Sequence, residues 1–193
     1  MIHNKQYKIL NQFMGDYTRE IYGRELIGRI NISQKGIALA LEELEQEGML
    51  KSKKRGNMKF YSLNLKYSQI KEVIAMTELN RKMDFCLKNP KIGHIFRDDD
   101  RMVGIFGSHA RGNQKIGSDI DVYIVGKRKG EAYDKKGKIY DLNISVKHFT
   151  EKEFERLLKQ KNNLIKEIIK NHILIFNIEK FIDIVWKDYY GFD

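Results

Sequence analysis

The sequence predicts an α+β protein made of two small domains, and three observations lead to this. The first 66 residues show apolar residues at helical spacing and then two short strand-like runs. Two further apolar runs, at residues 101–106 and 118–125, have the length and composition of buried strands. From residue 150 on, helical patterns surround one more short apolar run. Together these patterns indicate a helical N-terminal domain followed by a small mixed sheet with C-terminal helices.

Composition limits the classes of protein that fit. A chain of 193 residues with 41% hydrophobic residues can bury a core and is not a disordered segment. Its single cysteine, Cys86, excludes an intramolecular disulfide. There is no secretory signal pattern and no apolar run of about 18 residues, so we expect a cytoplasmic protein without membrane contact. The formal charge of +10 favours a polyanionic partner, either nucleic acid or nucleotide.

The N-terminal domain begins with three predicted helices. Residues 7–14 and 22–30 each have apolar residues at helical spacing. Ser33 is a suitable N-cap for a third helix over residues 34–47. Residues 49–55 and 58–64 then indicate two strands joined by a basic turn. Three helices and a hairpin describe a winged helix, with domain bounds at residues 1–66.

The run from Arg24 to Asn64 resembles the winged helix-turn-helix domains of bacterial and archaeal regulators. That resemblance implies binding of double-stranded DNA, with the early part of the third helix in the major groove and the hairpin on the phosphates. The groove-facing residues would be Ser33, Gln34, Lys35 and Ala38, and the hairpin cations would be Lys51, Lys53, Lys54, Arg55 and Lys59. The end of the third helix is acidic, however, and such domains also bind proteins or form dimers, so both alternatives stay open.

A long connecting helix is expected between the two domains. Residues 67–87 keep a roughly helical apolar register, and Asn89 with Pro90, the only proline, ends it. We therefore assign residues 67–90 to a connector and residues 91–193 to the second domain.

Two carboxylates distinguish the second domain. In the run GSHARGNQKIGSDIDVYIV, which begins at Gly107, strict alternation places Asp119 and Asp121 on one face of a strand. Two adjacent carboxylates repel each other, and Mg²⁺, which prefers carboxylate and phosphate oxygens, is the natural compensation. The preceding turn can bind phosphate through a flexible glycine, hydroxyl groups and cations. Its candidate nucleotide-binding residues are Gly107, Ser108, His109, Arg111, Lys115 and Ser118.

The Gly107-Ser108 pair, the ten-residue gap, Asp119 and Asp121 resemble the signature of the DNA polymerase β-like nucleotidyltransferases, in particular their minimal type. The resemblance implies a third carboxylate on a neighbouring strand. Asp141 is the candidate, on the polar face of a strand expected over residues 138–146. A solvated strand acid is the ordinary alternative for Asp141.

This resemblance implies transfer of a nucleoside monophosphate, AMP from ATP, to a protein or nucleic-acid acceptor. Two Mg²⁺ or Mn²⁺ ions, about 3.5 to 4 Å apart, would be bridged by Asp119 and Asp121. Asp141 would either bind a metal or accept the acceptor's proton, and the sequence does not separate these roles. Ser108 and Arg111 would bind the β- and γ-phosphates, which leave as pyrophosphate.

The C-terminal stretch completes the predicted domain. Thr150 and Glu153 form a capping box, and we expect helices over residues 151–160, 163–171 and 179–190 with a strand over residues 173–176. These segments either cover the sheet or present an aromatic stripe to a homodimer partner.

Three function hypotheses follow. The chain is a nucleotidyltransferase whose winged helix recruits a substrate, a DNA-binding regulator that senses nucleotide, or an antitoxin that adds AMP to a partner such as a HEPN-type RNase toxin. The presence of Asp119, Asp121, Asp141, Ser108 and Arg111 favours catalysis, since a sensor would tolerate loss of the acids.

Overall fold

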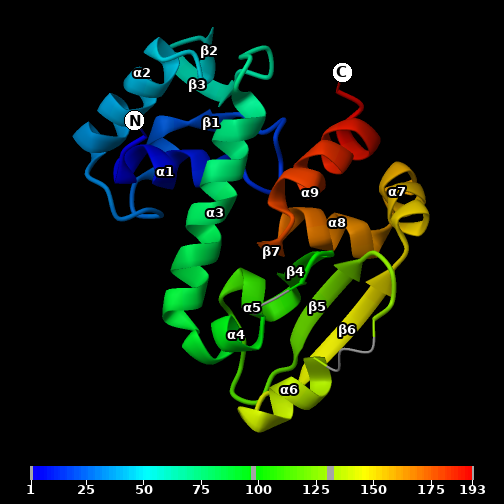
Figure 1. Cartoon of the computed structure of the whole chain (residues 1–193). Coiled ribbons are helices and arrows are strands. Elements are labelled where there is room, and N and C mark those ends of the chain that lie inside the picture. The colour runs from blue at the N-terminus through cyan, green and yellow to red at the C-terminus, as the bar shows by residue number, and fades with distance from the viewer. Residues whose placement is uncertain (1, 97–98, 130–132, 193) are drawn as a thin grey trace. The chain divides into compact units, whose positions relative to one another are not determined.

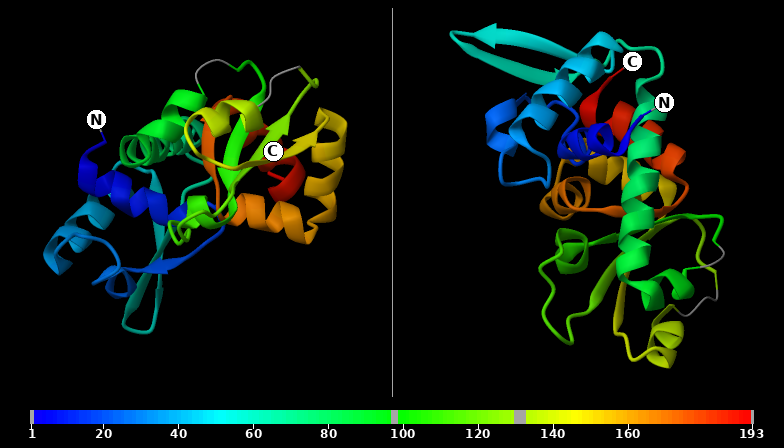
Figure 2. Two further views of the ribbon diagram at one scale, coloured as in Figure 1. Left: turned by 90° about the horizontal axis from the view of Figure 1, so that it is seen from below. Right: turned by 90° about the vertical axis from the view of Figure 1, so that its left-hand side faces the viewer.

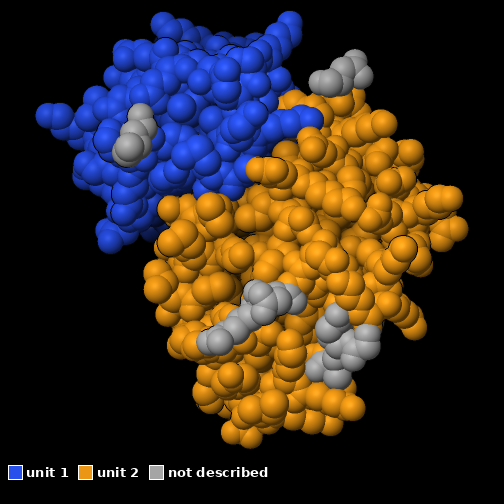
Figure 3. Space-filling view, in the orientation of Figure 1, with its two compact units in different colours: residues 1–77 blue, residues 78–193 orange. Residues whose placement is uncertain are grey.

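The computed structural model describes residues 2–96, 99–129 and 133–192, which divide into two compact units, residues 1–77 and residues 78–193 (Figure 3). Each unit has its own buried apolar residues. Within these described ranges, none of the helices has both the length and the apolar character needed to cross a bilayer.

Unit 1 combines short helices with a three-stranded antiparallel sheet (Figure 1). The sheet order is β1-β3-β2, and β2 and β3 pair along their full length. Figure 2 shows their hairpin projecting as a two-stranded ribbon. The elements are α1 (Asn4–Leu10), a 3₁₀ turn (Asn11–Phe13), β1 (Ile21–Tyr22), a second 3₁₀ turn (Gly23–Leu26), α2 (Gln34–Gln46), β2 (Leu50–Arg55) and β3 (Met58–Leu63).

Two of the expected N-terminal elements are confirmed and one is wrong. Helix α2 follows the expected N-cap, because the Ser33 side chain accepts a hydrogen bond from the backbone of Gly36. The hairpin is also present. The helix expected over residues 22–30 is not: β1 pairs with β3, and only one 3₁₀ turn follows it. Gly28 has a positive φ of 79°, which an α-helix does not accommodate, and pairing with β3 supplies the backbone bonds of β1 instead.

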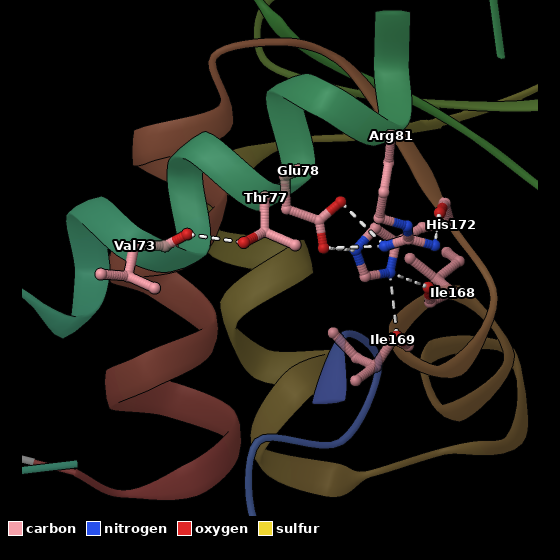
Figure 4. Close-up of polar contacts among 7 residues, drawn as sticks. All are labelled: Val73, Thr77, Glu78, Arg81, Ile168, Ile169 and His172. Atoms are coloured by element: carbon pink, nitrogen blue, oxygen red, sulfur yellow. Dashed lines mark hydrogen bonds and ion pairs between the residues drawn. The ribbon is translucent and has the colours of Figure 1, made fainter. Parts of the chain in front are cut away.

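Helix α3 (Ile70–Lys88) contains the boundary between the units. Asn89 follows it and Pro90 begins α4 (Pro90–Ile95), so the expected end of the long helix is confirmed. The part of α3 in unit 2 carries a buried polar network (Figure 4). Arg81 binds both carboxylate oxygens of Glu78 at 2.8 Å, and His172 Nε2 lies 3.1 Å from the same carboxylate.

Unit 2 is built around a four-stranded mixed sheet of order β6-β5-β4-β7. Strand β5 is parallel to β6, and the other pairs are antiparallel, so the mixed sheet expected from the sequence is confirmed. The strands are β4 (Met102–Phe106), β5 (Ile120–Val125), β6 (Ile144–Phe149) and β7 (Ile173–Phe176). The helices after α4 are α5 (Gly107–Arg111), α6 (Tyr133–Ile139), α7 (Glu151–Gln160), α8 (Asn163–Lys170) and α9 (Ile178–Ile184), followed by a π-helical turn (Val185–Tyr190).

Side chains alternate between the two faces of β5, as expected. Ile120, Val122 and Ile124 join the core formed with α4 and Tyr133. On the other face, the ring of Tyr123 stacks on Phe154 of α7 and also contacts Phe181 of α9. Residues on both faces of β5 therefore pack against helices, whereas Asp121, at the start of the strand, is only half-buried.

The strand expected over residues 138–146 is wrong in its first half. Helix α6 runs to Ile139, and β6 begins only at Ile144. The register explains the difference, because Ile144 pairs with Ile120, the first residue of β5, and earlier residues have no strand to pair with. Asp141 consequently lies in an exposed turn with a left-handed φ of 57°.

Candidate active site

The paired acids lie at the start of β5. Asp119 immediately precedes the strand and is exposed, while Asp121 is half-buried within it. Asp121 is opposite Phe106, the last residue of β4, and opposite Ser145 in β6. The carboxylates therefore lie beside the end of β4, where the Gly107 turn begins.

Gly107 brings that turn against the acid. Its φ is +69°, and a Cβ built at this position would overlap Oδ2 of Asp121 and lie 3.2 Å from the carboxyl carbon. Any larger residue would displace the carboxylate or the backbone. The sequence pattern of Gly107 and Asp121 thus corresponds to a direct contact between backbone and side chain.

Burial and several nearby charges act together on the Asp121 carboxylate. Burial and the neighbouring charge of Asp119 raise the pKa of Asp121 above its ordinary value. The nearby positive charges of Lys147, His109 and Arg111 oppose that rise without cancelling it. Burial is the largest cause, so the charged form of Asp121 is disfavoured mainly by desolvation and further by the charge of Asp119.

Three residues of the expected phosphate turn hold its shape. The His109 ring Nε2 lies 3.2 Å from the carbonyl oxygen of Ser118. The Ser118 hydroxyl accepts a hydrogen bond of 3.0 Å from the backbone N–H of Lys115. His109 Nδ1 is buried and has no hydrogen-bond partner within the described residues. The Ser118 hydroxyl is thus already hydrogen-bonded within the turn, whereas the Lys115 side chain is exposed to solvent.

Arg111 belongs to the same helix as Ser108 and is paired with an acid from another element. Its guanidinium forms an ion pair with Glu167 of α8, and both side chains are 38% exposed. A phosphate approaching Arg111 would compete with Glu167 for the same donors. Ser108 is half-buried at the start of α5, directly after Gly107.

Sequence reasoning missed two charged residues at this site. Lys147 acts on Asp121 from β6, and it continues the alternation from Ser145, so the polar-face pattern could have included it. Glu167 lies 56 residues from its partner Arg111, and no local pattern connects the two.

The third acid is not brought into the same cluster. Among residues 2–96, 99–129 and 133–192, no group of three or more His, Cys, Asp or Glu side chains is arranged to hold a metal. The position opposite Asp121 in β6 is Ser145, and Asp141 lies in the turn before that strand. The role assigned to Asp141 stays a prediction.

The residues expected to bind DNA lie on the surface of unit 1. Ser33 at the N-cap of α2 is exposed, and so are Gln34, Lys35 and Ala38 in the first turns of that helix. Two of the hairpin cations are in ion pairs: Arg55 with Glu20 at 2.5 Å and Lys59 with Glu45 at 2.6 Å. The exposed lysines Lys51, Lys53 and Lys54 form no ion pair with any residue that the structure describes.

Comparison with known families supports one part of this assignment. Residues 90–181 match the family described as Polymerase beta, Nucleotidyltransferase. The matched range contains the four strands of the mixed sheet, the Gly107 turn and both acids of the pair. This supports a polymerase β-like nucleotidyltransferase domain in this part of the chain, and nucleotidyl transfer as its general activity. Neither a curated protein nor a solved structure matched the chain.

Proposed function

We propose that the protein is a metal-dependent nucleotidyltransferase that moves AMP from ATP to a protein or nucleic-acid acceptor, with an N-terminal winged helix that binds double-stranded DNA. The observation that carries this proposal is the close contact of Gly107 with the carboxylate of Asp121, on which the charge of Asp119 also acts. Phosphoryl transfer requires a segment that binds phosphate and acids that bind a metal, and the Gly107 turn with the two acids would supply both.

The residues present fit a hard divalent cation at the pair. Asp121 carries a raised pKa beside Asp119, and a cation bound by both carboxylates would relieve this repulsion. Mg²⁺ would supply charge neutralisation at the phosphates and Lewis-acid polarisation. Asp119 and Asp121 would hold it, and Asp141 is the proposed third carboxylate.

In the proposed reaction an acceptor hydroxyl oxygen forms a bond to the α-phosphorus of ATP. The bond from the α-phosphorus to the bridging oxygen breaks, and pyrophosphate leaves. Arg111, released from Glu167, binds the leaving phosphates together with Ser108, and a carboxylate accepts the hydroxyl proton. Lys147 stands beside Asp121 and limits the negative charge that the triphosphate meets.

The test is transfer of label from α-labelled ATP in the presence of Mg²⁺. Acceptors to be supplied are the chain itself, RNA, DNA and candidate proteins including a HEPN-type ribonuclease. Asp119→Asn and Asp121→Asn should each reduce transfer by about 10³-fold, since each removes several kcal/mol of metal-dependent stabilisation. Asp84→Asn, an exposed acid on α3, is the matched control and should retain activity. Transfer that survives both site variants would exclude this active site.

A second candidate function is a nucleotide-sensing regulator. The observation that favours it is Ser145 opposite Asp121, where a third acid would complete a catalytic cluster. A sensor would bind ATP and Mg²⁺ without releasing pyrophosphate. Pyrophosphate release by the unmodified chain separates the candidates, and in the enzyme Asp141→Asn should abolish that release.

A further inference from the structure

Asp119, the first acid of the pair, stands at a junction between an exposed turn and a buried strand. Residues 111–117 are all exposed, whereas Ile120, the first residue of β5, is fully buried. On the strand side, the Ile120 N–H donates a hydrogen bond of 2.8 Å to the carbonyl oxygen of Asn143. The sheet therefore holds the backbone after Asp119, and the backbone before it needs a separate contact.

His109 supplies that contact from α5. Its ring Nε2 lies 3.2 Å from the carbonyl oxygen of Ser118, in the peptide group that joins Ser118 to Asp119. A carbonyl oxygen only accepts hydrogen bonds, so Nε2 carries the proton. The other ring nitrogen, Nδ1, is buried and has no hydrogen-bond partner within the described part of the chain. The bond from Nε2 is therefore the polar contact that orients the ring.

Other hydrogen bonds of this turn do not fix the same point. The Lys115 N–H donates to the Ser118 hydroxyl, and the Ser118 N–H donates to the Lys115 carbonyl oxygen, both at 3.0 Å. Both bonds join residues of the turn itself and would move with it. The Asn113 N–H donates to the Ser108 carbonyl oxygen at 3.2 Å, but this bond holds the start of the turn. The histidine ring connects α5 to the end of the turn, beside the first acid of the pair.

We propose that His109 is a positioning residue, whose Nε2–H fixes the peptide group before Asp119 and thereby holds the Asp119 carboxylate beside that of Asp121. This role rests on the proposed function, since it concerns the acids that would bind the metal there. Gly107, at the start of α5, contacts Asp121 directly. Helix α5 thus places both acids, one through a backbone contact and the other through a ring hydrogen bond. The role differs from direct contact with the nucleotide, which the sequence predicted for His109.

Two amide substitutions separate this role from the general effect of losing a histidine. The side-chain nitrogen of glutamine lies as many bonds from Cα as Nε2 of histidine does, whereas the nitrogen of asparagine corresponds to Nδ1. His109→Gln can therefore donate to the Ser118 carbonyl oxygen, and His109→Asn is too short to reach it. Both variants remove the ring and are uncharged, so a difference between them reports the hydrogen bond.

The experiment measures Mn²⁺ binding to the full chain by electron paramagnetic resonance, without nucleotide. We expect His109→Asn to weaken Mn²⁺ binding about three- to tenfold, the size of one hydrogen bond, and His109→Gln to recover most of that affinity. Gln114→Ala, at an exposed position in the same turn, is the control and should bind Mn²⁺ as the parent does. Loss of binding in Asp119→Asn identifies the measured site as the pair of acids.

Histidine ¹⁵N spectra of the full chain test the hydrogen bond itself in the absence of metal. In the neutral ring of His109 we expect the proton on Nε2 and none on Nδ1. The backbone amide signal of Asp119 should shift more in His109→Asn than in His109→Gln, because only the first variant loses the donor to that peptide group. Urea unfolding curves verify that each variant keeps the fold.

Any of three results would overturn the positioning role. They are a proton on Nδ1 of the neutral ring, equal Mn²⁺ affinities of His109→Gln and His109→Asn, or loss of ATP binding in both variants with Mn²⁺ affinity unchanged. The last result would assign the ring to the nucleotide instead. A parent chain that binds no Mn²⁺ would contradict the proposed function, and the ring proton with the Asp119 amide shift would still decide whether His109 holds this peptide group.

Discussion

A substitution of Gly107 should affect both the stability of the fold and the proposed function. Gly107→Ala introduces a Cβ that overlaps the Asp121 carboxylate and also forces a left-handed backbone on alanine. The backbone strain alone costs about 1 kcal/mol, and the overlap adds roughly 1–3 kcal/mol. We therefore expect a clear loss in the free energy of unfolding, measured by urea denaturation, together with loss of nucleotide binding.

Gly117→Ala is the matched control for this substitution. Gly117 has a similar positive φ of 81°, but nothing lies within 4 Å of a Cβ at that position. It should lose about 1 kcal/mol and keep nucleotide binding. Equal effects of the two substitutions would mean that the contact with Asp121 contributes nothing.

Replacing Asp121 should have opposite effects on activity and on stability, because it removes a carboxylate proposed for catalysis and stabilises the fold. Its pKa is raised in the folded state, so the folded protein holds this proton more tightly than the unfolded chain does. The slope of stability against pH is therefore negative between the ordinary pKa and the raised one, and the charged carboxylate opposes folding above that window. Asp121→Asn should then raise the melting temperature at pH 7 and have little effect at pH 3.

Added Mg²⁺ gives the complementary measurement. Since a cation between Asp119 and Asp121 removes their repulsion, Mg²⁺ should raise the melting temperature of the unmodified chain and not of Asp121→Asn. If Asp121→Asn is less stable than the parent at neutral pH, this result would contradict the proposed repulsion between Asp119 and Asp121.

At the scale of elements, the polar network of α3 fixes that helix to α8 and β7 within unit 2. His172 Nδ1 lies 3.0 Å and 2.9 Å from the carbonyl oxygens of Ile168 and Ile169, and Nε2 faces Glu78. Both ring nitrogens therefore face hydrogen-bond acceptors. Arg81 Nη2 also donates to the His172 carbonyl at 2.8 Å. The buried Glu78 carboxylate thus contacts both the Arg81 guanidinium and the His172 ring.

Glu78→Gln should destabilise the protein strongly, by about 3–5 kcal/mol, because it leaves the Arg81 guanidinium without its counter-charge. Burial alone would raise the pKa of Glu78, but the charges of Arg81 and His172 outweigh it and the pKa is lowered. The stabilisation is therefore present above the ordinary glutamate pKa and is lost as pH falls through the lowered one. The difference in unfolding free energy between parent and variant, measured by denaturation at several pH values, should shrink in acid. Asp84→Asn, on the exposed side of the same helix, should change it by less than about 0.5 kcal/mol.

The elements that the sequence predicted well are those whose signals are local. Helix α7 begins and ends at the expected residues because the Thr150 and Glu153 capping box marks its start. Strand β7 is likewise a short apolar run with the expected bounds. The failures depend on pairing between distant segments: β1 forms because β3 is beside it, and β6 begins where β5 begins. Of the site, the acids and the Gly107 turn were predictable, whereas Glu167 depends on how α8 packs.

At the scale of the whole molecule, the formal charge of +10 is arranged so that some cations are neutralised and others are not. On the β2–β3 hairpin, Lys59 is paired with Glu45, while Lys53 is exposed and forms no ion pair with a described residue. If the hairpin contacts DNA phosphates, only the unpaired cations release counterions fully. Binding should therefore be strongly salt-dependent, and the residues should contribute unequally.

Lys53→Ala should reduce the slope of log affinity against log salt by about 1, and Lys59→Ala by clearly less, because the Lys59 charge is already compensated. The measurement is fluorescence anisotropy of the full chain with duplex DNA of mixed sequence at several salt concentrations. The two variants remove the same formal charge from the same hairpin, so bulk electrostatics cannot separate them. Slopes unchanged from the parent in both variants would mean that the hairpin is not the phosphate-binding surface, and a protein-binding role for unit 1 would then be the better interpretation.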